Sequence, residues 1–292
     1  MTFSIVGADL EKGDWGVAVA SKFPAVGAVV PWARAGVGAV ATQSWANTTY
    51  GPEGLALMGS GTAAQDALDR LVDADEQKQE RQAGFVDVLG RAATFTGTGC
   101  SDWAGGVIGE RFAAQGNILT GAAVVDQMAA AFTAAEGDLC DRLLAALVAG
   151  DQAGGDRRGR QSAALLVVRE GGGYEGGNDR YIDLRVDDHP DAIVEMVRLF
   201  AVWDETMLVR NDPLLDATAA LVTDIQRRLS ALGRFHGEPS GILDQPTRAA
   251  LADFAGTYNL EGRLRDDEML SQLLVREICD LTPELNPPAP SG

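Results

Sequence analysis

The residue whose position most directly suggests chemistry is Thr2. An aminopeptidase that removes initiator methionine accepts small residues at position 2, and its action would leave Thr2 with a free α-amine beside its own hydroxyl. An α-amine has a pKa of about 7.7–8.0, so part of it is an unprotonated base near neutral pH. Such an amine can take the proton from Oγ1 while that oxygen attacks a carbonyl carbon. Thr2 is therefore a candidate nucleophile with its own base, although many chains begin Met-Thr without catalytic use of it.

Two apolar runs directly after Thr2 indicate a β-hairpin. Residues 3–8 and 15–21 are rich in small and β-branched side chains, and residues 9–14 between them are polar and include a glycine. Two such runs joined by a short polar loop are typical of an antiparallel strand pair. A strand inside a core would place Thr2 at a sheet end rather than on a frayed tail.

The register of this hairpin decides which side chains meet Thr2. If Asp9 lies opposite Asp14, Ser21 lies opposite Thr2, with Lys22 one position beyond. A slip of one residue would place Lys22 opposite Thr2 instead. We expect Lys22 to favour the neutral amine and the developing alkoxide, and Ser21 to orient the amine. The alternative is a satisfied strand-end hydroxyl and a lysine that extends into water.

Amide hydrolysis also needs hydrogen-bond donors aimed at the tetrahedral oxyanion. Asn117 follows an expected strand and has the flexible Gly116 before it, so it is the first candidate donor. Gln43 and Ser44, at the end of another expected strand, are further candidates for binding the substrate. All three side chains could instead cap turns.

One dense basic cluster occurs in the chain, within residues 154–160. An arginine fork binds a carboxylate through two hydrogen bonds, so this loop could hold an anionic substrate. We expect Arg158 to face the site and Asp156 to hold the loop. The alternative is a solvated loop whose charges pair with the surrounding acidic surface.

Cys100 is a rival nucleophile, but no histidine is placed to act as its base. The two histidines, His189 and His236, lie beside a helix start and in the C-terminal region. A buried structural thiol is therefore the alternative interpretation of Cys100. The histidines, cysteines and carboxylates form no close group, so we expect no metal site and no cofactor.

Composition limits the classes of partner. The formal net charge is -18, from 24 Lys plus Arg against 42 Asp plus Glu, which argues against nucleic acid or an anionic membrane as the main partner. No apolar run approaches the roughly 20 residues that a bilayer-spanning helix needs. The N-terminus also lacks the features of a signal peptide, so we expect a cytoplasmic protein.

The expected elements alternate between blocks of strands and pairs of helices. That order suits two stacked sheets covered by helices on both outer faces. We expect strands over residues 3–8, 15–21, 26–30, 37–42, 84–89, 92–96, 107–115, 162–168 and 181–186, and helices over residues 52–74, 122–135, 138–149 and 190–203.

Several separated blocks resemble a widespread prokaryotic family of unknown function that has the N-terminal nucleophile (Ntn) hydrolase fold. These blocks are residues 2–6, 16–22, 41–43, 116–117 and 155–162. The resemblance implies an α+β, four-layer αββα sandwich over residues 1–210. By analogy with Ntn hydrolases, it also implies that an N-terminal threonine attacks an amide.

The region after residue 210 differs in character. Residues 214–282 are expected to form a small all-helical domain, and residues 221–255 resemble peptidoglycan-binding helical modules. A packing or oligomerisation role is the other interpretation, because no export signal accompanies the module. Residues 283–292 are rich in proline and are expected to form a disordered tail.

The leading hypothesis is therefore a cofactor-independent amidohydrolase that opens the C–N bond of a small, carboxylate-bearing amide or lactam. Its catalytic residues would be Thr2, Ser21, Lys22 and Asn117, and its substrate-binding residues Gln43, Ser44, Asp156 and Arg158. A homo-oligomer is expected. The alternatives are a non-catalytic protein that binds a small anion in the same pocket and a cell-wall-associated binding module.

Overall fold

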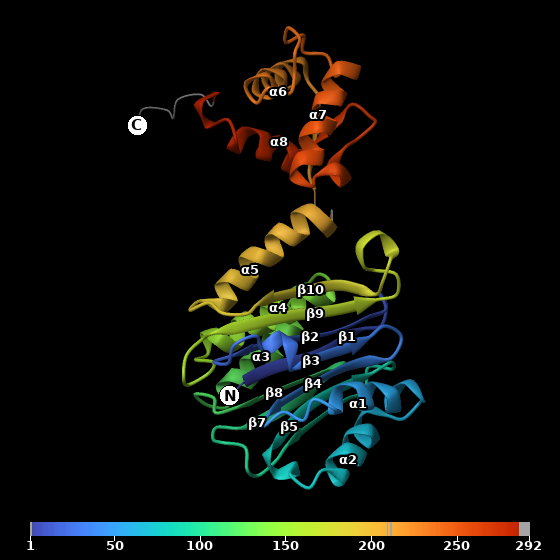
Figure 1. The fold of residues 1–292 in the computed structure, drawn as a ribbon, viewed down its shortest axis with the longest axis vertical. Coiled ribbons are helices and arrows are strands. Elements are labelled where there is room, and N and C mark those ends of the chain that lie inside the picture. Colours follow the sequence, from blue (N-terminus) through green and yellow to red (C-terminus); the bar gives the residue numbers. More distant parts are fainter. Residues whose placement is uncertain (1, 209, 211, 286–292) are drawn as a thin grey trace. The chain divides into compact units, whose positions relative to one another are not determined.

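The computed structural model describes residues 2–208, 210 and 212–285 (Figure 1). The chain divides into two compact units, Met1–Leu199 and Phe200–Gly292. Among the described residues, no helix is both long enough and apolar enough to cross a membrane.

The N-terminal unit contains a six-stranded antiparallel sheet in the order β10-β9-β2-β1-β8-β7. Strands β1 and β2 form the expected hairpin, and β8 and β9 flank it on either side. The strands are β1 (Thr2–Asp9), β2 (Asp14–Ser21), β7 (Gly105–Gly109), β8 (Phe112–Asn117), β9 (Ser162–Arg169) and β10 (Arg180–Val186). β1 therefore lies inside the sheet, hydrogen-bonded on both edges.

A second antiparallel sheet has four strands in the order β3-β4-β5-β6. They are β3 (Pro31–Arg34), β4 (Gly38–Ser44), β5 (Arg81–Asp87) and β6 (Ala92–Thr96). The strand expected over residues 26–30 is wrong, because Val26–Ala28 forms a 3-10 turn and the strand begins at Pro31. Proline lacks a backbone N–H, and the first position of an edge strand such as β3 is one of the few sheet positions that accepts it.

Helices pack on both sheets, which makes the unit a mixed α+β structure. α1 and α2 contact β4, β5 and β6, whereas α3 and α4 contact β1, β2 and β8; β1 contacts β4 and β5 of the other sheet. The helices are α1 (Tyr50–Gly59), α2 (Ala64–Ala74), α3 (Ala123–Ala134), α4 (Leu139–Gln152) and α5 (Ala192–Trp203). A capping box of Asp138 and Asp141 begins α4, satisfying backbone N–H groups that a helix start leaves open.

Side chains along β1 alternate between the two faces of the sheet. Val6 belongs to the apolar core shared by the two sheets, and Thr2 and Ser4 fall on that same face. Phe3 falls on the opposite face, where its ring lies against Gly150 of α4 closely enough that an added Cβ would be 3.2 Å away. The hydroxyls at the start of β1 therefore face the second sheet, and the aromatic ring faces a helix.

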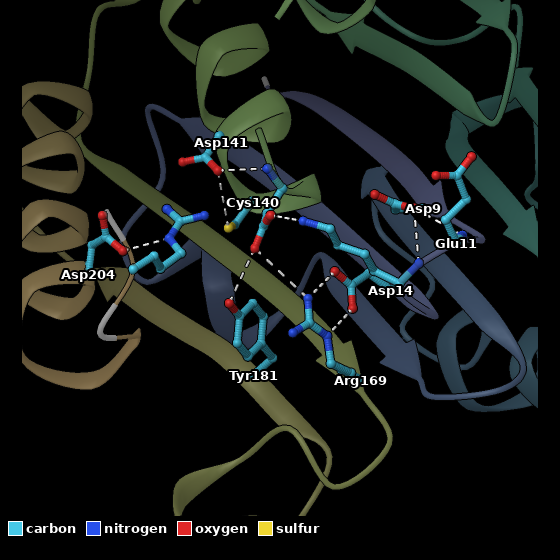
Figure 2. Close-up of polar contacts among 11 residues, drawn as sticks. Asp9, Glu11, Asp14, Cys140, Asp141, Arg169, Tyr181 and Asp204 are labelled. Carbon is cyan, nitrogen blue, oxygen red and sulfur yellow. Dashed lines mark hydrogen bonds and ion pairs between the residues drawn. The ribbon is translucent and has the colours of Figure 1, made fainter. Parts of the chain in front are cut away.

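The far end of the hairpin holds a network of charged groups (Figure 2). The Arg169 guanidinium donates to both carboxylate oxygens of Asp14, at 2.6 and 2.7 Å, and stacks over the Tyr181 ring. Lys12 pairs with Asp138, whose carboxylate also accepts from the Tyr181 hydroxyl at 3.4 Å. Burial raises the pKa of Asp14, and the Arg169 hydrogen bonds oppose that rise.

The C-terminal unit packs three helices around one apolar core. They are α6 (Ala219–Ala231), α7 (Gln245–Tyr258) and α8 (Gln272–Asp280). The expectation of an all-helical domain omitted a two-stranded ribbon, in which β11 (Leu214–Asp216) pairs with β12 (Met269–Ser271). Each ribbon strand has only three residues, too short for a strand pattern to appear in the sequence.

The proline-rich segment expected to be disordered is described only in part. Pro283–Leu285 forms a 3-10 turn, and the buried Arg228 donates from Nη1 to the carbonyl of Thr282 just before it at 3.0 Å. Residues 286–292 lie outside the described residues.

Candidate active site

The hairpin has the first of the two registers that the sequence left open, because Asp9 pairs with Asp14 and Phe3 with Ala20. This register sets Ser21 beside Thr2, and the two hydroxyl oxygens lie 3.1 Å apart in a hydrogen bond that either can donate. Both side chains are buried, with Thr2 exposed by 6%. A threonine hydroxyl with a hydroxyl neighbour can pass or receive a proton without moving its backbone.

Asn117 lies on the other side of Thr2. The two residues pair across β1 and β8, so their side chains share the face directed at the second sheet. The Asn117 amide is 1% exposed, and its Nδ2 donates to Oε1 of Gln82 at 2.9 Å. An amide nitrogen carries two hydrogens, and one of them remains for a further acceptor beside Thr2.

Gln82 of β5 fixes the orientation of the Asn117 amide. Nε2 of Gln82 donates to the carbonyl of Gly116 at 2.7 Å and to the Thr96 hydroxyl at 2.9 Å. Because a carbonyl can only accept, the nitrogen of Gln82 must lie on that side and its oxygen must face Asn117. The Asn117 amide must therefore present its nitrogen to Gln82, so its rotamer is determined by bonds on a different sheet.

The same reasoning extends from Gln82 to Gln43. Nε2 of Gln43 donates to Oε1 of Gln82 at 2.8 Å and lies 3.4 Å from the carbonyl of Thr2. Its Oε1 accepts from the Ser4 hydroxyl at 2.6 Å, and Ser4 in turn accepts from Nε2 of Gln115 at 2.7 Å. Gln43, which was predicted to bind substrate, is 1% exposed, and its amide contacts the backbone carbonyl of Thr2.

We define the inter-sheet amide cluster as Ser4, Gln43, Gln82, Gln115 and Asn117. Its members come from β1, β4, β5 and β8, and each is at most 1% exposed. Buried polar groups are costly unless they are hydrogen-bonded. A closed, uncharged cluster of this kind therefore holds the strand ends in one arrangement. The sequence analysis missed Ser4, Gln82 and Gln115, although polar residues at inward positions of apolar strands signal such a cluster.

Lys22 does not take the position that the sequence analysis expected. It follows Ser21 at the end of β2, its side chain is exposed, and its Nζ donates to the carbonyl of Arg160 at 3.2 Å. The Lys22 ammonium is therefore engaged by the loop at Arg160, and among the described residues it forms no hydrogen bond with Thr2.

Asp156 ties the loop after α4 to the ends of β2 and β8. Its buried carboxylate accepts from the backbone N–H of Lys22 and of Arg158, each at 2.8 Å. Its backbone forms a β-bridge with Leu119, two residues after Asn117. The Arg158 guanidinium is about half exposed and lies 3.4 Å from the same carboxylate. This geometry fits a loop-holding role for Asp156.

Ser44 and Cys100 lie together near the end of β4. Ser44 has a φ of 69°, in the left-handed region that is uncommon outside glycine. Burial raises the pKa of the Cys100 thiol, even though a hydrogen bond with Ser44 acts in the opposite direction. A neutral, buried thiol fits the structural interpretation of Cys100. Among the described residues, no group of three His, Cys, Asp or Glu side chains is arranged to hold a metal.

Asp75 anchors the start of β5 from outside the cluster. It accepts from Nε of Arg81 at 2.8 Å and from Nδ2 of Asn47 at 3.0 Å. The Arg81 hydrogen bond, supported by the others, holds the pKa of Asp75 well below its usual range. The ion pair thus fixes Arg81, the residue directly before Gln82.

A pocket of about 440 Å³ opens at the Thr2 end of β1 and β2, and its lining residues come from both faces of the sheet. Its walls include Phe3, Ala20, Ser21, Asp156, Arg157, Arg160 and Ile193. Thr2 is not among the lining residues, but Ser21 is, and the Ser21 hydroxyl bonds that of Thr2. Ser21 therefore links the candidate nucleophile to the pocket.

Comparisons with known proteins give relatives for both units. Residues 211–276 match the family described as "Putative peptidoglycan binding domain". The crystal structure of protein SPO2555 from Silicibacter pomeroyi, described by the family model DUF1028, superposes with a TM-score of 0.63 at 33% identity and covers 70% of this chain and 89% of that one. No curated protein matches the chain. Residues 2–196 match the family described as "Family of unknown function (DUF1028)", and the chain belongs to that family.

Proposed function

We propose that the N-terminal unit is an Ntn-type amidohydrolase that cleaves the C–N bond of a small amide or lactam bearing a carboxylate, with Thr2 as its nucleophile. The observation that carries the proposal is the buried Thr2 hydroxyl, 3.1 Å from Ser21 and paired across the strand with Asn117. A nucleophile needs a fixed position, a proton acceptor and donors for the oxyanion. The free α-amine that methionine removal would create supplies the proton acceptor.

The reaction divides into two steps that use the same groups. The α-amine of Thr2 takes the Oγ1 proton while Oγ1 bonds to the substrate carbonyl carbon, and the second N–H of Asn117 stabilises the oxyanion. Collapse of this intermediate breaks the C–N bond, and the ammonium of Thr2 gives its proton to the departing nitrogen. Water, deprotonated by the same amine, then attacks the ester carbonyl on Oγ1. The acyl–oxygen bond breaks, the ammonium returns its proton to Oγ1, and the acid is released.

The arrangement of the layers supports the proposal. The contacts of α1 and α2 with one sheet, of α3 and α4 with the other, and of β1 with β4 and β5 support a four-layer αββα sandwich as part of this proposal. In the Ntn hydrolase fold the nucleophile begins a strand of that sandwich. Thr2 begins β1, which is the position that this fold requires.

Intact mass spectrometry and a substrate panel test the proposal together. The native protein is expected to lack Met1, and it should hydrolyse a member of a panel of small carboxylated amides and lactams. Thr2→Ala should abolish turnover but retain binding of that substrate, and Thr2→Ser should keep part of the activity. Undiminished turnover by Thr2→Ala, or by protein that retains Met1, would disprove the mechanism. Binding without turnover in the wild-type protein would favour the non-catalytic anion-binding protein.

A second candidate function concerns the C-terminal unit, for which the family match over residues 211–276 favours cell-wall binding. This unit has a pocket of about 340 Å³ with apolar and arginine side chains, among them Arg248, Leu251 and Met269. The full chain should sediment with purified insoluble peptidoglycan, and soluble muropeptides should compete. Failure to sediment would leave packing or assembly as the role of this unit.

A further inference from the structure

We infer that Arg157 binds the carboxylate of the substrate in the pocket beside Ser21, an inference that rests on the proposed function. Arg157 lines this pocket together with Phe3 and Ala20. Its backbone N–H donates to the carbonyl of Ile118 at 3.3 Å, which fixes the base of the side chain against the segment after Asn117.

Among the charged side chains that line the pocket, Arg157 is the one whose charge no ion pair matches within the described part of the chain. Asp151 accepts from Nε of Arg160 at 2.6 Å, and Asp191 lies 3.6 Å from Nη1 of the same guanidinium. Asp156 is satisfied by two backbone N–H groups and by Arg158.

By contrast, the Arg157 guanidinium forms no hydrogen bond or ion pair with the rest of the described chain, residues 2–208, 210 and 212–285. Arg157 is exposed where it lines the pocket, and in a chain of formal charge -18 such an unmatched cation attracts an anion to that place.

The shape of the pocket determines what else the ligand needs. Phe3, Ala20 and Ile193 give it apolar walls, and Ser21 lies where it approaches the Thr2 hydroxyl. A planar guanidinium matches a carboxylate through two parallel hydrogen bonds. The ligand class is therefore an N-acylamino acid or a related lactam acid, with its reactive carbonyl near Ser21 and its carboxylate at Arg157.

Binding measurements on the Thr2→Ala protein test this without depending on turnover. The probes are matched pairs of an acid and its neutral amide. The first pair is N-acetylglycine and N-acetylglycine methylamide, and further pairs use longer and cyclic acids. Ligand-detected NMR measures the binding of each probe. We expect the carboxylate member of at least one pair to bind about tenfold or more tightly. Arg157→Gln should abolish that preference, and Arg157→Lys should keep only part of it.

Arg70→Gln is the matched control, because it removes one exposed arginine charge from α2, which packs on the other sheet. This variant should keep the preference. Equal binding of both members throughout the panel, absence of binding by every carboxylate, or a preference that survives Arg157→Gln would overturn the inference. A carboxylate preference in a wild-type protein that hydrolyses nothing would support Arg157 while the proposed function fails.

Discussion

The two ends of the β1–β2 hairpin bury polar groups in opposite ways. At the Asp14 end, a carboxylate with no exposed surface meets a guanidinium through two short hydrogen bonds. At the Thr2 end, the side chains bonded to one another around Thr2 are hydroxyls and amides, and the nearby buried carboxylate of Asp156 accepts from backbone N–H groups. The same two strands therefore end in an ion pair on one side and in a neutral network on the other.

Under the proposed function, this difference separates a structural end of the hairpin from a reactive one. An ion pair in which each charge is matched holds two strands in register but leaves nothing for a substrate. A neutral network avoids the cost of burying charge and can still direct N–H groups at a substrate atom. The comparison thus predicts that variants at the Thr2 end change rate and that variants at the Asp14 end change stability.

After loss of the Thr2 hydroxyl itself, Asn117→Ala should have the largest effect on rate. Removing one donor to an oxyanion lowers kcat by about 10²–10³, and the paired backbone of β8 should hold the fold. Steady-state kinetics on the substrate found by the panel would measure the loss, and circular dichroism would check the fold. A folded variant with wild-type kcat would show that Asn117 is not an oxyanion donor.

Asp14→Ala should have the largest effect on stability. It would leave Arg169 without its main carboxylate, and loss of one partner of a buried pair costs about 3–5 kcal/mol. Because the Arg169 side chain is 28% exposed, water can solvate part of its unpaired charge. We therefore expect the free energy of unfolding to fall by about 2–4 kcal/mol. Urea unfolding measures it. A variant that loses catalysis but not stability would contradict the division between the two ends.

Gln82→Leu should affect both rate and stability, since Gln82 holds Asn117 without reaching the substrate. We expect kcat to fall about 10–100-fold and KM to stay near its wild-type value, because only the direction of the Asn117 amide is released. Gln115→Leu is the matched control, because Gln115 bonds to Ser4 rather than to Asn117. If Gln82→Leu and Gln115→Leu lost kcat equally, Gln82 would have only a structural role and would not position Asn117 for catalysis.

Two carboxylates should give pH dependences of opposite sign. The pKa of Asp75 is lowered by folding, so its contribution is present above the unfolded value of 3.8 and is lost as pH falls through the folded pKa. The pKa of Asp14 is raised, so the free energy of unfolding decreases as pH rises from 3.8 through the folded pKa. Asp75→Asn and Asp14→Asn should each remove one of these trends from acid unfolding curves. Identical curves for the two variants would contradict the assigned directions.

Lys22→Met should have the smallest effect. The Lys22 ammonium is bonded to the carbonyl of Arg160, so we expect a loss of kcat of less than about tenfold from weakened long-range electrostatics. A larger loss, together with a shifted pH–rate profile, would return Lys22 to the catalytic group that the sequence analysis proposed.

The local sequence pattern predicted the β-hairpin, but it could not predict which side chains would meet across the two sheets. The apolar runs over residues 3–8 and 15–21 and the polar loop between them predicted the hairpin but left two registers open. The structure has the register that brings Ser21 to Thr2, and Lys22, which follows β2, bonds instead to the carbonyl of Arg160. Gln82 could not be identified in this way, because its partner Asn117 lies on another sheet and far along the chain.

The sequence predicted the basic loop that lines the pocket, but not which of its side chains would face a ligand. The basic cluster in residues 154–160 was recognised, but which of its arginines lacks a carboxylate depends on Asp151 and Asp191, outside that loop. The ribbon of β11 and β12 was missed for a similar reason, since three-residue strands are defined by their pairing rather than by their composition.

The position of β1 inside its sheet also has a consequence for the order of events during synthesis. β1 emerges from the ribosome well before its partner strands, because Asn117 of β8, and β9 beyond β2, are synthesised much later. At about 5–20 residues per second, the start of β1 stays accessible for roughly 6–23 s before β8 can enclose it. An aminopeptidase therefore has time to act on the nascent chain, and the later burial of Thr2 would protect the new terminus rather than prevent its formation.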